Sequence, residues 1–180
     1  MLKQGDQAPP FDLQSDAGKA VKLSDFAGKV LVLYFYPRDN TPGCTREALA
    51  FSEGLARFTA AGARVVGVSK DSVKSHGTFR DKYSLAIPLL SDPDLALHKA
   101  FGAWGEKTMY GKKVEGAIRS TFVIGPDGKI AKVFPSVKVD GHVEKVLEAL
   151  GGGGAKAAAP AKKTAPAKKT APAKKTVKKR

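Results

Sequence analysis

Cys44 is the only cysteine in the 180-residue chain, and its position makes it the first candidate for a reactive side chain. It follows an apolar run over 30–36 and the tripeptide Thr41-Pro42-Gly43. The run predicts a buried strand, and Thr followed by Pro predicts a helix with Thr41 at its N-cap. Cys44 then lies in the first helical turn, where free backbone N–H groups and the helix dipole favour a thiolate over a thiol. A thiolate placed in this way is a nucleophile.

The competing interpretation is a structural cysteine. A lone cysteine is more often a small buried hydrophobic side chain than a nucleophile. Here the context favours the nucleophile, because α/β proteins place their chemistry at the carboxyl ends of strands and the helix starts that follow them.

Glu47 lies one helical turn after Cys44, so it could anchor a cationic partner there. On spacing alone, Glu47 is equally consistent with an acid that complements the helix dipole.

Charge divides the chain into a body and a tail. The sequence holds 31 Lys and Arg against 17 Asp and Glu, for a formal net charge of +14. Nine lysines and one arginine lie in 151–180, which contain no acidic residue. The length of the segment 1–150 predicts a single domain. We expect neither a secretion signal nor a membrane span, since no apolar segment of about 18 residues is present. A single cysteine fits a reducing compartment, so we expect a cytoplasmic protein.

Strand and helix patterns alternate along the body. This order predicts an α/β fold with a mixed central sheet flanked by helices. The last two strands are expected to form a hairpin across the turn at 125–128. The predicted strands are 30–36, 63–68, 87–90, 119–124 and 129–134, and the predicted helices are 42–62, 72–83, 94–101 and 140–150.

The pattern Pro37-x-x-x-Thr41-x-x-Cys44 resembles the active-site signature of the peroxiredoxins. The strings at 34–37, 41–48 and 119–124 resemble the bacterioferritin-comigratory, or Q-type, group of that family. The similarity covers nearly all of residues 1–150. It implies a thioredoxin-like fold and a thiol-dependent peroxidase that reduces hydrogen peroxide and organic hydroperoxides without a cofactor.

The resemblance also implies a role for each site residue. Cys44 would attack the peroxide and become a sulfenic acid. The Thr41 hydroxyl would face the sulfur and the peroxide, and the Arg119 guanidinium would lie over the sulfur. Glu47 would orient Arg119 through a charge-assisted pair, and Pro37 would shield the site. Taken alone, Arg119 is as readily a surface arginine at the start of a strand.

The chain departs from many Q-type relatives because it lacks a second, resolving cysteine. Some relatives carry one at the position of Leu49, and others carry it in the helix around 78–83, where this chain has none. An external thiol should therefore reduce the oxidised enzyme, and thioredoxin, glutaredoxin or a small thiol could serve. We expect a monomer.

Other residue types point to no further chemistry. The three histidines, His76, His98 and His142, lie among polar residues without the spacing of metal ligands, so we expect no metal site. Trp104 and Tyr110 are expected to pack against the domain or its loops.

The tail, residues 151–180, has its own composition. Four glycines are followed by three copies of Ala-Pro-Ala-Lys-Lys-Thr, at 159–164, 165–170 and 171–176. We expect this segment to be disordered. It could bind nucleic acid through phosphate contacts, act only as a solubility tail, or bind acidic membranes or polyphosphate. Nucleic-acid binding would make the protein nucleoid-associated, and the alternative function is a DNA-binding protein with a redox-sensing domain. The candidate contacts are Lys162, Lys163, Lys168, Lys169, Lys174, Lys175, Lys178, Lys179 and Arg180.

Overall fold

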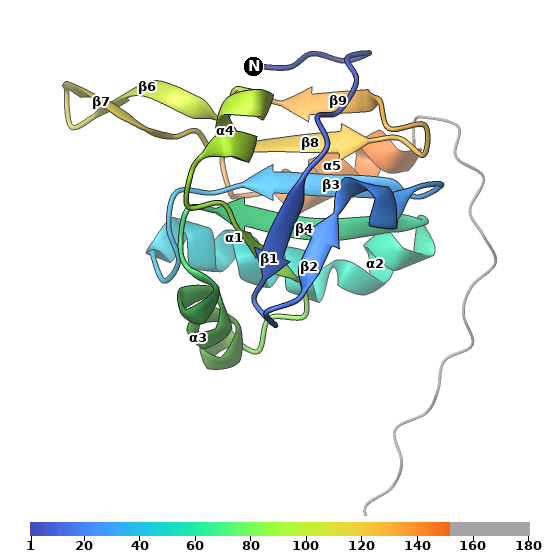
Figure 1. The fold of residues 1–180 in the computed structure, drawn as a ribbon, viewed down its shortest axis with the longest axis horizontal. Coiled ribbons are helices and arrows are strands. Elements are labelled where there is room, and N and C mark those ends of the chain that lie inside the picture. The colour runs from blue at the N-terminus through green and yellow to red at the C-terminus, as the bar shows by residue number, and fades with distance from the viewer. Residues whose placement is uncertain (152–180) are drawn as a thin grey trace, which may run out of the picture.

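The computed structural model describes residues 1–151. The strands and helices expected from the sequence are present in the expected order, together with two further hairpins (Figure 1). The strands are β1 (Asp12–Ser15), β2 (Ala20–Lys22), β3 (Val30–Phe35), β4 (Ala63–Ser69), β5 (Leu89–Ser91), β6 (Trp104–Met109), β7 (Lys112–Ala117), β8 (Ser120–Ile124) and β9 (Ile130–Phe134). The helices are the 3-10 turn η1 (Leu23–Phe26), α1 (Pro42–Glu53), α2 (Leu55–Ala60), α3 (Val73–Tyr83), α4 (Ala96–Phe101) and α5 (His142–Gly151).

A seven-stranded mixed sheet forms the centre, with the strand order β2-β1-β5-β4-β3-β8-β9. The three strands β5, β4 and β3 are parallel, whereas β1 and β8 run antiparallel to their neighbours β5 and β3. The predicted α/β fold with a mixed sheet is therefore confirmed. Because β3 is paired on both sides, its carboxyl end is held from two directions, and the chain leaves it directly into the Cys44 loop.

Alternate residues of β3 enter two hydrophobic cores. Val32 and Tyr34 pack with residues of α1, α2, α3 and α5 on one face of the sheet. Leu33 and Phe35 pack with residues of α4 and the N-terminal segment on the other face. A strand buried on both faces reads as a continuous apolar run, which is why β3 is evident in the sequence.

Several elements differ from the sequence prediction. The helix expected over 42–62 is broken at Gly54, which ends α1 and begins α2. The two hairpins β1–β2 and β6–β7 were not predicted. Strand β7 is mostly exposed, and the β2 side chains are exposed or only half-buried, so neither has the apolar alternation that signals a half-buried strand. The expected linker and tail lie outside the described residues, apart from Gly151.

Within residues 1–151, no helix combines the length and the apolar character needed to cross a bilayer.

Candidate active site

The start of α1 positions Cys44 as the sequence predicts. Thr41 is the N-cap residue with extended backbone angles, and Pro42 is the first helical residue. The first hydrogen bond of the helix runs from Thr45 N to Thr41 O at 2.9 Å, so the N–H groups of Gly43 and Cys44 precede the helical ladder. The Cys44 side chain is only 1% exposed. It is therefore a recessed thiol at the positive end of a twelve-residue helix.

Arg119 reaches the sulfur from the neighbouring strand. It directly precedes β8, whose first residue Ser120 pairs with Phe35 at the end of β3. Arg119 Nη2 donates to Cys44 Sγ at 3.2 Å. A Cβ atom on Gly43 would lie 3.2 Å from the same nitrogen, so a glycine there lets the guanidinium approach closely. The predicted contact between arginine and sulfur is present.

Glu47 holds the other side of the guanidinium. Its Oε2 accepts a hydrogen bond from Arg119 Nη1, and its side chain is 1% exposed. Its Oε1 is buried without a hydrogen-bond partner among the described residues. Burial raises the pKa of Glu47 to about 7, although the charge and hydrogen bond of Arg119 act to lower it. Glu47 thus lies where an orienting carboxylate was expected, but its environment resists the negative charge.

The Thr41 hydroxyl has a different partner from the one expected. It donates to the Arg38 carbonyl oxygen at 3.0 Å and makes no capping hydrogen bond. The hydroxyl proton is thus directed into the loop rather than toward the sulfur, and the oxygen keeps its lone pairs as acceptors. Pro37, half-buried, follows β3 at the entrance to this loop.

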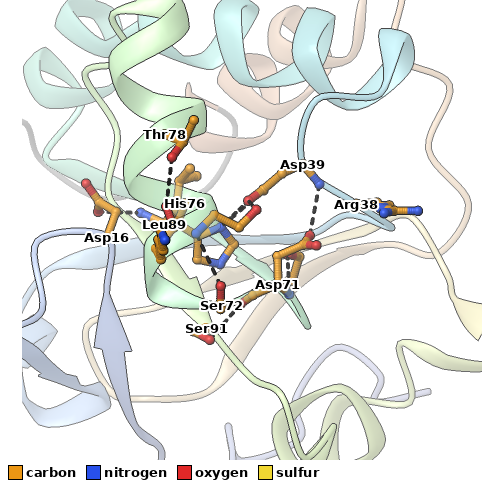
Figure 2. A network of polar contacts seen from close by, with 12 residues as sticks. Asp16, Arg38, Asp39, Asp71, Ser72, His76, Thr78, Leu89 and Ser91 are labelled. Carbon is orange, nitrogen blue, oxygen red and sulfur yellow. Dashed lines mark hydrogen bonds and ion pairs between the residues drawn. The ribbon is translucent and has the colours of Figure 1, made fainter.

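Three buried histidines show what sequence reasoning missed. In the sequence they lie among polar residues, but in the structure His76, His98 and His142 are each at most 3% exposed. His76 contacts Asp39 and His98 contacts Asp92, at 2.9 and 2.7 Å. No local pattern marks the His76 pair, because its partner lies 37 residues away along the chain. Figure 2 shows the contacts of Asp39, on the loop that leads to Cys44, with both His76 and Asp71.

The β6–β7 hairpin adds a cation beside the site. Lys107 is partly buried, and its Nζ donates to the Ala117 carbonyl oxygen at 2.9 Å, two residues before Arg119. Burial, followed by the charge of Arg119, lowers the pKa of Lys107.

The packing expected for Tyr110 is wrong, since this residue is 98% exposed at the tip of the hairpin. Trp104 meets the His98 ring edge to face.

Within residues 1–151, His, Cys, Asp and Glu side chains form no group of three that could hold a metal ion. The side chains that the structure brings together at the Cys44 sulfur are the Arg119 guanidinium and, on its other side, the buried Glu47 carboxylate.

Comparison with known proteins agrees with this geometry. Residues 4–133 match the AhpC/TSA family. A Xanthomonas campestris protein named peroxiredoxin Bcp is 50% identical over 145 residues, which cover 79% of this chain and 91% of that protein. The Bacillus subtilis peroxiredoxin Bcp is 44% identical over 149 residues, or 83% of this chain and 95% of that protein. The chain therefore belongs to the AhpC/TSA family and is a peroxiredoxin of the Bcp, or peroxiredoxin Q, group.

Solved structures agree with the fold. Peroxiredoxin Q of Xylella fastidiosa, as a cysteine-to-serine variant, superposes with a TM-score of 0.80 at 44% identity, covering 84% of this chain and 97% of that chain. Peroxiredoxin Q of Xanthomonas campestris superposes with a TM-score of 0.75 at 48% identity, covering 79% and 90%. Structures of two variants of the Xanthomonas protein also match, and in each a different cysteine is replaced by serine. This chain has one cysteine.

Proposed function

We propose that this peroxiredoxin reduces hydrogen peroxide and organic hydroperoxides through a sulfenic acid on Cys44. The observation that carries the proposal is the 3.2 Å contact between Arg119 Nη2 and the Cys44 sulfur at the start of α1. The bacterioferritin comigratory protein of Xanthomonas campestris, which is 48% identical to this chain, has alkyl peroxide reduction activity. Its similarity to this chain supports organic hydroperoxides as substrates here.

The reaction divides into an oxidation and a reduction. The Cys44 thiolate attacks one peroxide oxygen, the O–O bond breaks, and the sulfur becomes a sulfenic acid while the leaving oxygen takes a proton as water or alcohol. The Arg119 guanidinium stabilises the thiolate and the departing oxygen. Glu47 holds Arg119 in place, Pro37 shields the sulfur, and the Thr41 hydroxyl positions the peroxide.

The reduction of the sulfenic acid needs a thiol from outside the chain, since the sequence has no other cysteine. One external thiol condenses with the sulfenic acid, releasing water and forming a mixed disulfide. A second thiol then attacks that disulfide and releases Cys44. Thioredoxin, glutaredoxin or a small thiol could supply these steps, and the enzyme works as a monomer.

Turnover with a panel of thiols tests this proposal. We expect peroxide consumption by the wild-type chain with at least one thiol donor and none above background for Cys44→Ser. After graded peroxide, intact mass should show added oxygen atoms, first as sulfenic and then as sulfinic and sulfonic acids. A serine variant with wild-type turnover would contradict the assignment of Cys44. A loss of two hydrogens without added oxygen would contradict the one-cysteine route.

We also propose that the tail over 151–180 tethers a catalytic domain of residues 1–150 to nucleic acid in the cytoplasm. The supporting observation is its ten positive charges without any acidic residue. Lysines that engage phosphates release counterions, so log affinity should fall with log salt at a slope of roughly −5 to −9 if about six to ten lysines take part. Such binding would hold a peroxide scavenger near DNA.

A truncation tests the tether. Full-length protein should bind duplex DNA at about 50 mM salt without sequence preference, as measured by fluorescence anisotropy. Deletion of 151–180 should remove binding and leave peroxide turnover unchanged. Equal binding by both forms, or none by either, would leave the tail as a solubility element. DNA binding without any peroxidase turnover would favour the alternative, a DNA-binding protein with a redox-sensing domain.

A further inference from the structure

The loop between β3 and α1 is anchored through one buried carboxylate. Asp39 Oδ1 accepts a hydrogen bond from Tyr36 Oη at 2.7 Å, and Oδ2 accepts one from Ser75 Oγ at 2.7 Å. The backbone N–H of Asp39 donates to Asp71 Oδ2 at 2.9 Å. The Asp39 side chain is only 3% exposed. Its contacts therefore join the loop to the end of β3, to α3 and to the segment after β4. Figure 2 shows the contact with Asp71.

His76 on α3 completes this anchor, and both of its ring nitrogens face acceptors. The Tyr36 hydroxyl also lies 3.4 Å from Nδ1, but its proton is donated to Asp39 Oδ1, so its oxygen faces the ring as a further acceptor. Nδ1 lies 2.9 Å from Asp39 Oδ2 and 3.1 Å from Asp39 Oδ1. Nε2 lies 3.1 Å from the Leu90 carbonyl oxygen of β5. A neutral imidazole carries one N–H and one lone pair. In this site, a neutral ring would turn its lone pair toward either a carboxylate or a carbonyl oxygen.

A lone pair that faces an oxygen lone pair is repelled by it. Burial makes this repulsion costly, because the His76 side chain is fully shielded from water. The contacts are all satisfied if the ring carries both protons and donates to Asp39 and to Leu90 O. The ionised carboxylate of Asp39 then balances the imidazolium charge. Burial opposes ionisation of Asp39, but the hydrogen bond and charge of His76, together with the hydrogen bonds from Ser75 and Tyr36, hold the pKa of Asp39 below its ordinary value.

We propose that His76, as a buried imidazolium, is a positioning residue for Cys44, because it holds Asp39 and thereby the loop that begins the Cys44 helix. Asp39 is two residues before the N-cap Thr41, and Asn40 between them adopts a left-handed conformation with φ of 59°. With so short a connection, a displacement of Asp39 moves Thr41 and the first turn of α1. The functional part of this inference rests on the proposed peroxidase function.

A second buried pair provides a matched control. His98 Nδ1 contacts Asp92 Oδ2 at 2.7 Å, and both side chains are as buried as those of His76 and Asp39. The Nε2 atom of His98, however, has no hydrogen-bond partner in the described part of the chain. His98 belongs to α4, which packs in the core on the other face of the sheet from Cys44. Both pairs join a buried histidine to a buried aspartate, but only His76 has an acceptor at each ring nitrogen and only its aspartate lies in the Cys44 loop.

Nitrogen-15 NMR of the full-length wild-type chain tests the ring directly. We expect both His76 nitrogens to carry protons at neutral pH, and Asp39→Asn to remove one of them. One lone-pair nitrogen on His76 in the wild-type protein would overturn the proposal. This measurement needs neither a His76 variant nor peroxidase activity, so it stands even if the peroxidase function fails.

Kinetics test the positioning role. His76→Gln should slow oxidation of Cys44 by peroxide at least tenfold, with a cooperative melting transition retained, whereas His98→Gln should change this rate by less than about twofold per folded molecule. The double variant Asp39→Asn with His76→Gln should be no slower than the slower single variant, because both act through one contact. A His76→Gln rate within about twofold of wild type would overturn the proposal. An inactive wild-type chain would instead overturn the peroxidase function.

Discussion

Arg119 links Cys44 to Glu47 across the start of α1: Nη2 donates to the sulfur at 3.2 Å, and Nη1 donates to the buried carboxylate. The fork of the guanidinium serves two acceptors that lie three residues apart on one helix face. A lysine has a single ammonium group and cannot reproduce this arrangement with the same geometry. Both acceptors therefore depend on the same planar group.

Arg119→Met should slow Cys44 oxidation by peroxide more than tenfold, which corresponds to about 1.4 kcal/mol of lost transition-state stabilisation. Arg119→Lys should lie between wild type and the methionine variant, because the charge remains but the two-pronged contact is lost. Stopped-flow measurement of the second-order rate constant checks both variants. An unchanged rate for Arg119→Met would remove the arginine from the mechanism.

Thr41→Val should also slow peroxide attack more than tenfold, since it removes the hydroxyl from the site. Thr41→Ser should be milder because it keeps the hydroxyl. The Thr41 side chain makes no capping hydrogen bond, so we expect the valine variant to lose less than about 0.5 kcal/mol of helix capping stability. Rates and urea unfolding measured on the same samples separate the two effects. A slow rate explained by unfolding alone would count against the proposed role.

Glu47 should make the protein less stable as the pH rises. Its pKa in the folded chain is about 7, against 4.5 ordinarily, so between these values the folded protein binds more protons than the unfolded protein. Its contribution to the free energy of unfolding should therefore fall by about 2.5 kcal/mol from about pH 5 to about pH 8.

Glu47→Gln should remove that dependence, because glutamine keeps an acceptor for Arg119 without titrating. Urea unfolding at both pH values, for the variant and the wild type, provides the comparison. Parallel pH profiles for the two proteins would show that Glu47 stays ionised throughout this range.

His142 should have the opposite effect in acid. Burial, with the charges of Lys145 and Arg119, lowers its pKa from 6.5 to about 4. Between these values the unfolded chain binds more protons, so the free energy of unfolding falls on acidification. This contribution should amount to about 2 kcal/mol between about pH 7 and about pH 5.

His142→Gln should lose less stability than the wild type over the same change in pH. The glutamine can still form a hydrogen bond with Thr121, whose Oγ1 lies 2.8 Å from His142 Nε2. Urea unfolding at the two pH values measures the difference. Equal losses in both proteins would mean that His142 is protonated in the folded state.

The local elements around Cys44 follow from the sequence because their signals are local. The apolar run that forms β3, the N-cap at Thr41 and the proline after it require only residues adjacent in the chain. The spacing of Cys44 and Glu47 on one helix face is also a local property. The alternation of strands and helices along the body was sufficient to predict the mixed sheet, but not the weakly patterned β1–β2 and β6–β7 hairpins.

Tertiary structure decided what no local pattern encodes. Arg119 reaches Cys44 because β8 pairs with β3, which brings together residues 75 positions apart. The raised pKa of Glu47 depends on burial beneath that contact. The pairing of His76 with Asp39 depends on packing of α3 against the Cys44 loop. Composition and spacing thus determine which groups are available and where helices begin, whereas burial and long-range strand pairing decide which groups meet and how strongly they hold their protons.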